Sequence, residues 1–301
     1  MARALAGLLA LALAAAPLGA APAAGTFGRD TLDGRAYRVW IPSRPAPARP
    51  VVIALHGCWQ TPEEFALGTR LNEVAEARGL VVVYPAQSRR ENPYRCWNWF
   101  DPAQQQASGP ETAQILAIAQ RAQSEHGVRQ PKVLVLGFSA GAWMAVNLAC
   151  VAPEKVSGVG ALAGGPFKCA TGPAAAIQCM RGTGRDRAGT AGACAGGRAP
   201  HLRASLWQGA LDPVVSPANL TALETMFGRL LGVSAGVTSP DGGAVHAIYK
   251  DARGAAVLES WLVPGMGHAW SGGDPRATHT WAPGPRATER MLDFLLGAER
   301  S

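Results

Sequence analysis

The sequence predicts an α/β fold in which a mainly parallel sheet is covered by helices on both faces. Short apolar runs alternate with helical patterns along nearly the whole chain, which is typical of this fold class. The 301 residues, 48% of them hydrophobic, supply enough apolar material for one large core. Neither an internal repeat nor an interdomain linker is visible, so residues 25–301 are expected to form a single domain.

The first 24 residues have the pattern of a secretory signal peptide. Arg3 precedes an unbroken Leu/Ala run, and small residues with Ala-x-Ala spacing follow near Ala21 to Ala24. The apolar run is short for a membrane span and no later run is long enough, so stable membrane insertion is not expected. We expect an exported protein, located in the periplasm or in the medium.

The first half of the remaining chain begins with strands at 36–42 and 50–57, which a Pro-rich connection separates. Residues 61–79 are expected to form one helix, with a Thr cap, Pro at the first position and a terminal glycine. A short buried strand follows at 80–85, and then a long loop that contains the sequence CWNWF at 96–100. A helix over 109–127 and a strand over 132–137 complete this half.

The second half continues with a helix that runs through Cys150 and a strand at 156–164. Residues 165–200 are rich in Gly, Ala and Arg and hold three cysteines, so an irregular insertion over one end of the sheet is expected there. The elements expected after it are strands at 203–209, 245–249 and 257–263 and helices at 217–231 and 287–297.

A serine between glycines stands where a predicted strand meets a predicted helix. The sequence Gly-Phe-Ser-Ala-Gly at 137–141 has the form of the turn that exposes a nucleophilic serine, Ser139. Glycines are required because a strained serine leaves no room for Cβ atoms where strand and helix approach each other. The helix N-terminus behind the serine favours negative charge. The alternative is a tight turn that happens to hold a serine.

A serine hydroxyl is a weak nucleophile that needs a base, and the base needs an orienting acid. In this type of fold the acid and then the histidine follow the serine, each in a loop after a later strand. Asp212 stands just past the strand that ends at Gly209, and His268 stands just past the strand that ends at Val263. Weaker candidates are His126, His201, His246, His279, Asp241, Asp251 and Asp274.

An oxyanion would need two backbone N–H donors. Ala140, the residue after the serine, is expected to supply one. The other is expected from Cys58, in the loop after an early strand, where Gly57 allows the backbone to turn. His56 is expected to hydrogen-bond within this loop or to cap the strand rather than to act as the base.

Charge and cysteine content limit the other classes of partner. The net charge of +7 comes mostly from scattered arginines without a Lys/Arg block, so a nucleic-acid partner is not expected. Six cysteines in an exported chain indicate up to three disulfides. Their spacing does not match a metal site, so no metal is expected, and the chemistry above needs no organic cofactor.

Together these motifs resemble the secreted poly(3-hydroxybutyrate) depolymerase family of esterases, relatives of the feruloyl and acetylxylan esterases. The resemblance covers nearly the whole chain after the signal peptide. It rests on HGCWQ, CWNWF, GFSAGAWMA, GGPFKCA, DPVVSPAN and GMGHAWSGG, which begin at residues 56, 96, 137, 164, 212 and 265. It implies an α/β-hydrolase fold and a catalytic triad of Ser139, Asp212 and His268.

The resemblance also implies a disulfide between Cys58 and Cys96, which would tie the oxyanion loop to the CWNWF loop. The alternative is that either cysteine is simply a small buried apolar residue. The remaining cysteines are expected to cross-link the irregular insertion, with their pairing left open: Cys150, Cys169, Cys179 and Cys194.

Aromatic residues in the loops could form a substrate groove. Trp97, Trp99 and Trp270 lie in loops expected to meet at the carboxyl edge of the sheet, where they would line an apolar groove for an acyl group or polyester. Alternatively they pack under the loops as core. Asn98 could align a substrate carbonyl.

The expected function is that of an exported serine esterase that hydrolyses poly- or oligo(3-hydroxybutyrate)-type polyesters through an acyl-enzyme. The chain departs from the resemblance after CWNWFDP, and it ends soon after the last core helix, without the polymer-adsorbing domain of many depolymerases. Short oligomers, amorphous polymer or small esters are therefore the expected substrates. The alternatives are a feruloyl or acetylxylan type of carbohydrate esterase, and an exported binding module without ester turnover.

Overall fold

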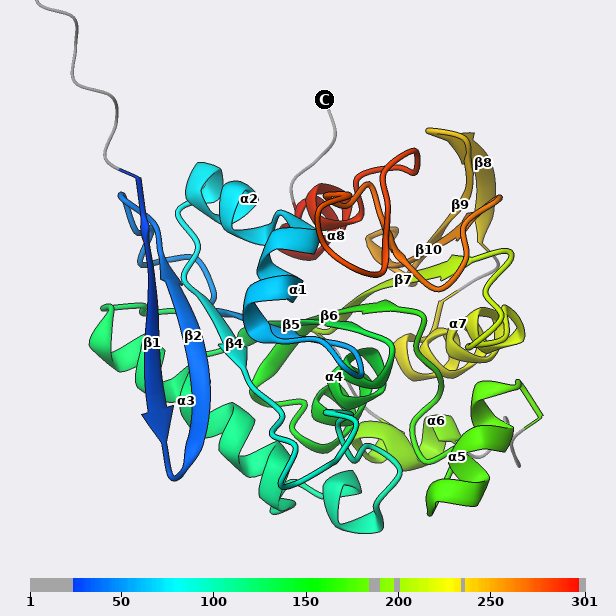
Figure 1. The fold of residues 1–301 in the computed structure, drawn as a ribbon. Coiled ribbons are helices and arrows are strands. Elements are labelled where there is room, and N and C mark those ends of the chain that lie inside the picture. Colours follow the sequence, from blue (N-terminus) through cyan, green and yellow to red (C-terminus); the bar gives the residue numbers. More distant parts are fainter. Residues whose placement is uncertain (1–23, 184–189, 198–200, 234–235, 298–301) are drawn as a thin grey trace, which may run out of the picture.

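The computed structural model describes residues 24–183, 190–197, 201–233 and 236–297 (Figure 1). The expected signal peptide lies outside these residues except for Ala24. Within the described ranges, helices that combine enough length with enough apolar character to span a bilayer are absent.

The framework is a ten-stranded sheet with the order β1-β2-β4-β3-β5-β6-β7-β10-β9-β8. Its strands are β1 Thr26–Leu32, β2 Arg35–Ile41, β3 Val52–Leu55, β4 Val82–Pro85, β5 Val133–Phe138, β6 Val156–Leu162, β7 Arg203–Gly209, β8 Val237–Asp241, β9 Ala244–Lys250 and β10 Ala256–Val263. The central pairings from β4 to β10 are parallel, whereas the pairings at both edges are antiparallel. The expectation of a mainly parallel sheet is confirmed for its central part.

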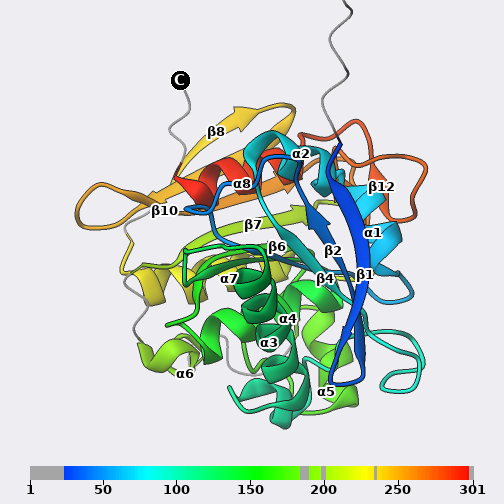
Figure 2. The same cartoon turned by 90° about the vertical axis from the view of Figure 1, so that its left-hand side faces the viewer.

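Helices cover both faces of this sheet, as expected. They are α1 Pro62–Thr69, α2 Leu71–Arg78, α3 Pro110–Glu125, α4 Ala140–Val151, α5 Pro173–Met180, α6 Thr190–Ala193, α7 Ala218–Leu231 and α8 Ala287–Leu296. Figures 1 and 2 show α1, α2 and α8 on one face and α3, α4 and α7 on the other. Two short 3-10 helices, Pro102–Gln105 and Cys194–Gly197, and a small parallel pair, β11 Trp270–Ser271 and β12 Thr280–Trp281, lie in the connections.

The packing of the core explains why the central strands and helix α4 could be predicted from the sequence. Every residue of β3, β4 and β5 is buried, because helices cover these strands on both sides. Helix α4 is buried over nearly its whole circumference, which accounts for its almost continuous run of apolar residues. A parallel sheet sandwiched between helices thus produces uninterrupted hydrophobic runs rather than alternation.

The helix expected over 61–79 is in fact two helices, because the chain breaks at Arg70. This residue takes a left-handed conformation with φ 53°. Carbonyl groups at the end of α1 bond elsewhere instead of continuing the helix: the Gly68 oxygen accepts from the Asp274 amide, and the Thr69 oxygen accepts from the Thr288 hydroxyl. Partners more than 200 residues away in the sequence therefore decide the break.

Other differences lie at the periphery. The edge strands β1 and β8 were not expected, since neither contains a buried residue or a hydrophobic run. The segment at 165–200, expected to be irregular, contains the regular helix α5. Most residues of this helix are small, and only Ala176 and Cys179 are buried, so the segment carries a weak periodic pattern.

Candidate active site

Ser139 stands in a strained turn between β5 and α4. Its backbone has φ 54° and ψ −122°, a region that costs energy for any residue with a side chain. A Cβ at Gly137 would lie 2.2 Å from the Gly141 oxygen, and a Cβ at Gly141 would lie 2.1 Å from the Leu55 oxygen. Only glycine therefore allows the helix to begin directly against the ends of β3 and β5.

The structure brings Ser139, His268 and Asp212 together in one hydrogen-bonded chain. The Nε2 atom of His268 lies 2.9 Å from Ser139 Oγ, and its Nδ1 atom lies 2.7 Å from Asp212 Oδ2. The serine follows β5, the aspartate follows β7 and the histidine follows β10, so three loops at one edge of the sheet supply these side chains. All three lie in a largely buried environment, with Ser139 7% exposed and Asp212 6% exposed.

Asp212 is held as a carboxylate by its surroundings. Its Oδ1 atom accepts hydrogen bonds from the backbone amides of Val214 and Val215, both at 2.8 Å, and its Oδ2 atom also accepts from Gln208. Burial by itself would raise the pKa of Asp212, but the hydrogen bond from His268 and its charge, aided by those amides, lower it below the usual value. The carboxylate is thus ionised and fixed in orientation beside the imidazole.

Two backbone amides, one directly after the serine and one in the loop after β3, have no acceptor within the described part of the chain. These are the amides of Cys58 and Ala140, the positions expected from the sequence to bind an oxyanion. Ala140 is the first residue of α4, whose N-terminal amides point away from the helix body. An N–H that bonds to neither backbone nor side chain is available to a ligand oxygen.

The segment that carries the Cys58 amide is built around His56. Its Nδ1–H donates to the Gly57 oxygen at 2.8 Å and its Nε2 accepts from the Gln87 amide at 3.1 Å, so the ring is neutral. Complete burial lowers the pKa of His56 to about 4, and the positive charge of Arg95 adds to this effect. The oxygen of Gln60 accepts from the Gly57 amide at 2.9 Å. These bonds agree with an internal role for His56.

Three disulfides connect the described cysteines. Cys58 bonds to Cys96 and joins the Cys58 loop to the CWNWF loop. The other bonds are Cys150–Cys194 and Cys169–Cys179, which the sequence left open. The first of these ties the end of α4 to the segment at 165–200, and the second closes a loop inside that segment.

The tryptophans expected to line a groove lie in the core instead. Trp97 is completely buried and donates to the His56 oxygen, and Trp99 stacks on Trp143 with ring centroids 4.5 Å apart. Trp270 is 3% exposed and packs edge-on against Phe65. The alternative that these rings pack under the loops is therefore the correct one. Indole rings bury a large apolar area, which favours their packing in the core under these loops.

Asn98 does not point to the substrate side, contrary to expectation. Its amide group donates to Glu111 at 2.7 Å and accepts from Asn92 at 2.9 Å, and its backbone N–H also donates to Glu111. Glu111 is 4% exposed, and burial raises its pKa although it accepts these hydrogen bonds. Nothing in the sequence singles out Glu111, because an acidic residue in the first turn of a helix is an ordinary helix signal.

The weaker candidates from the sequence serve other purposes. His246 is buried, bonds to Glu259 at 2.9 Å and stacks on Trp261, and Asp274 pairs with Arg276 and Arg70. His279, however, lies beside the site, with its ring centroid 6.3 Å from that of His268. Burial and the neighbouring His268 lower the pKa of His279, which keeps a second charge away from His268.

Comparison with known proteins adds family information to this geometry. The chain is 32% identical to poly(3-hydroxyalkanoate) depolymerase C of Paucimonas lemoignei over 236 residues, which cover 76% of this chain and 56% of that protein. It is 26% identical to feruloyl esterase B of Thermothelomyces thermophilus over 260 residues, which cover 80% of this chain and 86% of that protein. The chain spans about half the length of the depolymerases that it matches.

Among solved structures, an acetyl xylan esterase from Aspergillus awamori superposes with a TM-score of 0.74 at 19% identity, covering 91% of this chain and 100% of that one. This likeness, together with the parallel sheet and its two helical layers, shows an α/β-hydrolase fold. Residues 35–246 match the family described as Esterase PHB depolymerase. With this match over more than half of its length, the chain belongs to the Esterase PHB depolymerase family.

Proposed function

We propose that this protein is a serine esterase that hydrolyses poly- or oligo(3-hydroxybutyrate)-type polyesters. The observation that carries the proposal is the hydrogen-bonded chain from Ser139 through His268 to Asp212, set in a strained turn of the fold. A buried carboxylate, an imidazole and a hydroxyl in this order can perform acyl transfer at neutral pH. The family and the depolymerase relative support a polyester as the acyl donor.

In the proposed reaction, Ser139 Oγ attacks the ester carbonyl carbon while His268 Nε2 accepts the hydroxyl proton. The carbonyl oxygen becomes an oxyanion that accepts hydrogen bonds from the amides of Cys58 and Ala140. His268 then gives its proton to the departing alcohol, and an acyl-enzyme remains on the serine. Water, deprotonated by the same imidazole, attacks the acyl-enzyme and releases the acid. Asp212 stabilises the imidazolium in both halves of the reaction.

We further propose that the protein is exported. The N-terminal 24 residues carry the signal-peptide pattern, and the three disulfides suit an oxidising compartment. The proposed partners are polyester oligomers or small esters.

A carbohydrate esterase of the feruloyl or acetylxylan type is the second candidate. The feruloyl esterase relative is matched over 86% of its length, a larger share than the 56% of the depolymerase. Both candidates use the same acyl-transfer chemistry, and they differ in the acid and alcohol that the loops around the serine accept.

A substrate panel tests the proposal. The protein without residues 1–24 is assayed with linear 3-hydroxybutyrate oligomers, methyl ferulate, acetylated xylan and p-nitrophenyl acetate, with the Ser139→Ala variant as control. Turnover of the oligomers, abolished in the variant, is expected. Activity confined to ferulate or xylan would contradict the polyester assignment. Unchanged activity in Ser139→Ala would contradict the mechanism, and absence of turnover with every ester would favour the binding-module alternative.

A further inference from the structure

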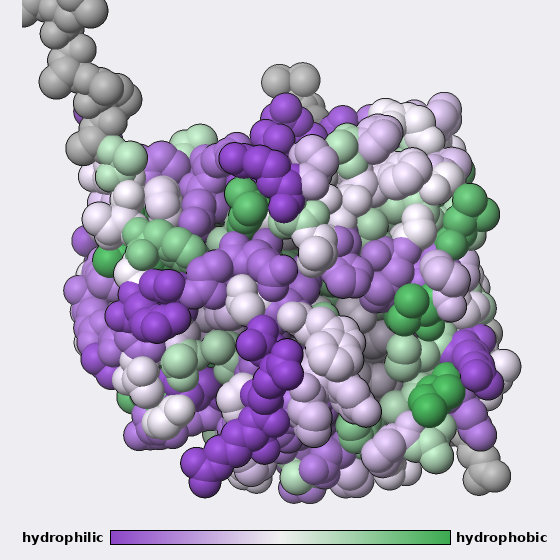
Figure 3. Space-filling model, viewed as in Figure 1, coloured by the Kyte–Doolittle hydropathy of each residue, from purple (hydrophilic) through white to green (hydrophobic). Residues whose placement is uncertain are grey.

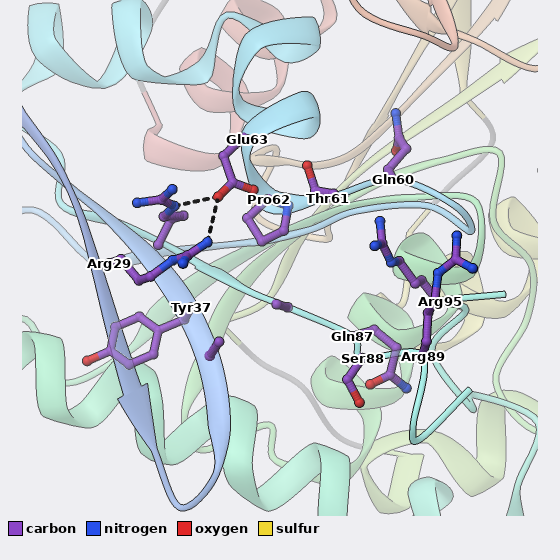
Figure 4. Close-up of a pocket in the computed structure, with 13 residues that line it drawn as sticks. Arg29, Tyr37, Gln60, Thr61, Pro62, Glu63, Gln87, Ser88, Arg89 and Arg95 are labelled. Carbon is purple, nitrogen blue, oxygen red and sulfur yellow. Dashed lines mark hydrogen bonds and ion pairs between the residues drawn. The ribbon is translucent and has the colours of Figure 1, made fainter. Parts of the chain in front are cut away.

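A pocket of about 380 Å³ lies next to the loop that carries the Cys58 amide. It is lined by residues of β1, β2, the start of α1 and the loop after β4, which Figure 4 shows as sticks. In the sheet, β3 separates β4 from β5, the strand that leads to Ser139. The pocket therefore lies beside the loop that carries the Cys58 amide, and a Cβ at Gly57 of that loop would lie 2.8 Å from Phe138, the residue before Ser139.

Lining residues on both sides of the pocket are connected to the loop that carries Cys58. The side chain of Gln60 lines the pocket and accepts the Gly57 amide, and the amide of Gln87 donates to His56. Arg95 immediately precedes Cys96, the disulfide partner of Cys58. Since Gln60 follows Cys58 by two residues, their Cα atoms are at most about 7 Å apart. A group in the pocket and a carbonyl at the Cys58 amide would therefore be close neighbours.

The residues that line the pocket carry an excess of positive charge. Four arginines and a single carboxylate, Glu63, are among the lining residues. Arg38 bonds to Glu63 at 2.6 Å, and Arg29 lies 3.7 Å from the same oxygen, so these two share the one acid. Neither Arg89 nor Arg95 forms a salt bridge with an acidic residue in the described ranges. Figure 4 shows both side chains on the side of the pocket near Gln60.

The backbone at Arg95 is held in place by its neighbours. Arg95 has φ 54°, a conformation that is strained for a residue with a side chain. Its amide donates to the Asn92 oxygen, while the Asn92 side chain accepts from the amides of Tyr94 and Cys96. Together with the disulfide at Cys96, these bonds fix the backbone position from which the Arg95 side chain extends. Arg95 is half-buried and has no acidic partner among the described residues, and a guanidinium group in this situation fits a planar anion, above all a carboxylate.

From this geometry we propose that the pocket binds the free carboxylate at the acid end of a polyester oligomer. The inference rests on the proposed function and narrows its substrate. In a linear hydroxy-acid oligomer, the acyl fragment that joins Ser139 carries the hydroxyl end. The fragment that leaves as the alcohol always carries the free carboxylate. The pocket is thus the site for the leaving fragment, and it selects short soluble chains cleaved near their acid end.

The surface around the site agrees with this choice. Figure 3 shows that the face seen in Figure 1 is mostly hydrophilic, with hydrophobic side chains in small separate patches. Trp59 and Tyr94 are exposed by 55% and 56%, and their rings pack edge to face with centroids 5.1 Å apart. They flank the segments that carry Gln60 and Arg95, so an apolar chain segment could rest on them while its charged end reaches the arginines.

The test compares the linear 3-hydroxybutyrate trimer with its methyl ester, which lacks the charge. For the wild type we expect kcat/KM to be about tenfold higher for the acid, as one charge-assisted hydrogen bond provides, and the preference should shrink at high salt. The double variant Arg89→Gln/Arg95→Gln should lose the preference through a higher KM for the acid. Arg95→Lys should retain part of it, since the charge remains but the planar fork is lost.

Arg90→Gln is the matched control, because Arg90 is exposed next to Arg89 but does not line the pocket. It should keep the preference for the acid. Equal kcat/KM for acid and methyl ester in the wild type, or an unchanged preference in the double variant, would overturn the inference while leaving the proposed function intact. If the wild type hydrolyses p-nitrophenyl acetate but neither trimer, the proposed function fails and the inference fails with it.

Discussion

Replacement of Asp212 by asparagine gives the sharpest test of the proposed mechanism. The carboxylate accepts four hydrogen bonds: Oδ1 from Val214 and Val215, and Oδ2 from His268 and Gln208. An asparagine keeps its oxygen toward the two backbone amides, because only an acceptor satisfies them. Its NH₂ group then faces His268 Nδ1, which must lose its proton to accept this hydrogen bond. The imidazole proton moves to Nε2, where it blocks uptake of the Ser139 proton.

The size of the effect follows from this change of tautomer. The base is lost although the 2.9 Å contact between Nε2 and the serine oxygen remains, so binding is unaffected and the chemical step suffers. We expect kcat/KM with p-nitrophenyl butyrate to fall by about 10⁴-fold, which corresponds to about 5 kcal/mol in the barrier. KM should change little, and a thermal melt should show that the variant is folded.

Asp274→Asn is the control for this experiment. Asp274 is 3% exposed and hydrogen-bonded like Asp212, but its carboxylate pairs with Arg276 at 2.7 Å. Its replacement should leave activity of the same order as in the wild type. The reasoning would be refuted if Asp212→Asn retained activity within about tenfold of the wild type, less than a lost general base costs. It would also be refuted if Asp274→Asn were equally damaging.

Three further predictions concern the framework of the site. Burial lowers the pKa of His56 from 6.5 to about 4, so its stabilising contribution is complete above pH 6.5 and lost as the pH falls toward 4. It should amount to about 3 kcal/mol, and urea titrations of His56→Gln should show a correspondingly flatter pH dependence of the unfolding free energy. The pair Cys58→Ser/Cys96→Ser should lose about 4 kcal/mol of stability and also kcat, whereas Cys150→Ser/Cys194→Ser, at the far end of α4, should lose stability alone. Gly141→Ala places a methyl group 2.1 Å from the Leu55 oxygen and should cost about 3 kcal/mol, visible as a lower Tm; an unchanged Tm would contradict the close packing of α4 on β3.

Much of the fold could be predicted because its signals are local. The buried central strands are continuous apolar runs, and nearly all buried residues of α4 and α8 are apolar. The loops that carry Ser139, Asp212 and His268 follow strand ends in the order that this fold requires, so their proximity could be inferred without coordinates. The exposed strand β8, which contains Pro240, has no such pattern and escaped prediction.

The surroundings of the site could not be predicted in the same way. An indole in a loop looks the same in sequence whether it faces a substrate or the core, and only the packing places Trp97 under the loop that carries Cys58. The break at Arg70 depends on hydrogen-bond partners from the C-terminal part of the chain. The unpaired charge of Arg95 becomes visible only when the acids near it are known.

The sequence by itself determined the order of the central strands and of most helices, the serine turn between glycines and the candidates for acid and base, because periodicity, glycine placement and strand ends are properties of neighbouring residues. The tertiary structure alone decided which aromatic rings are buried, which disulfides form in the segment at 165–200, and which arginines share one acid. These outcomes depend on competition for space and for hydrogen-bond partners among residues far apart in the chain, which no local pattern records.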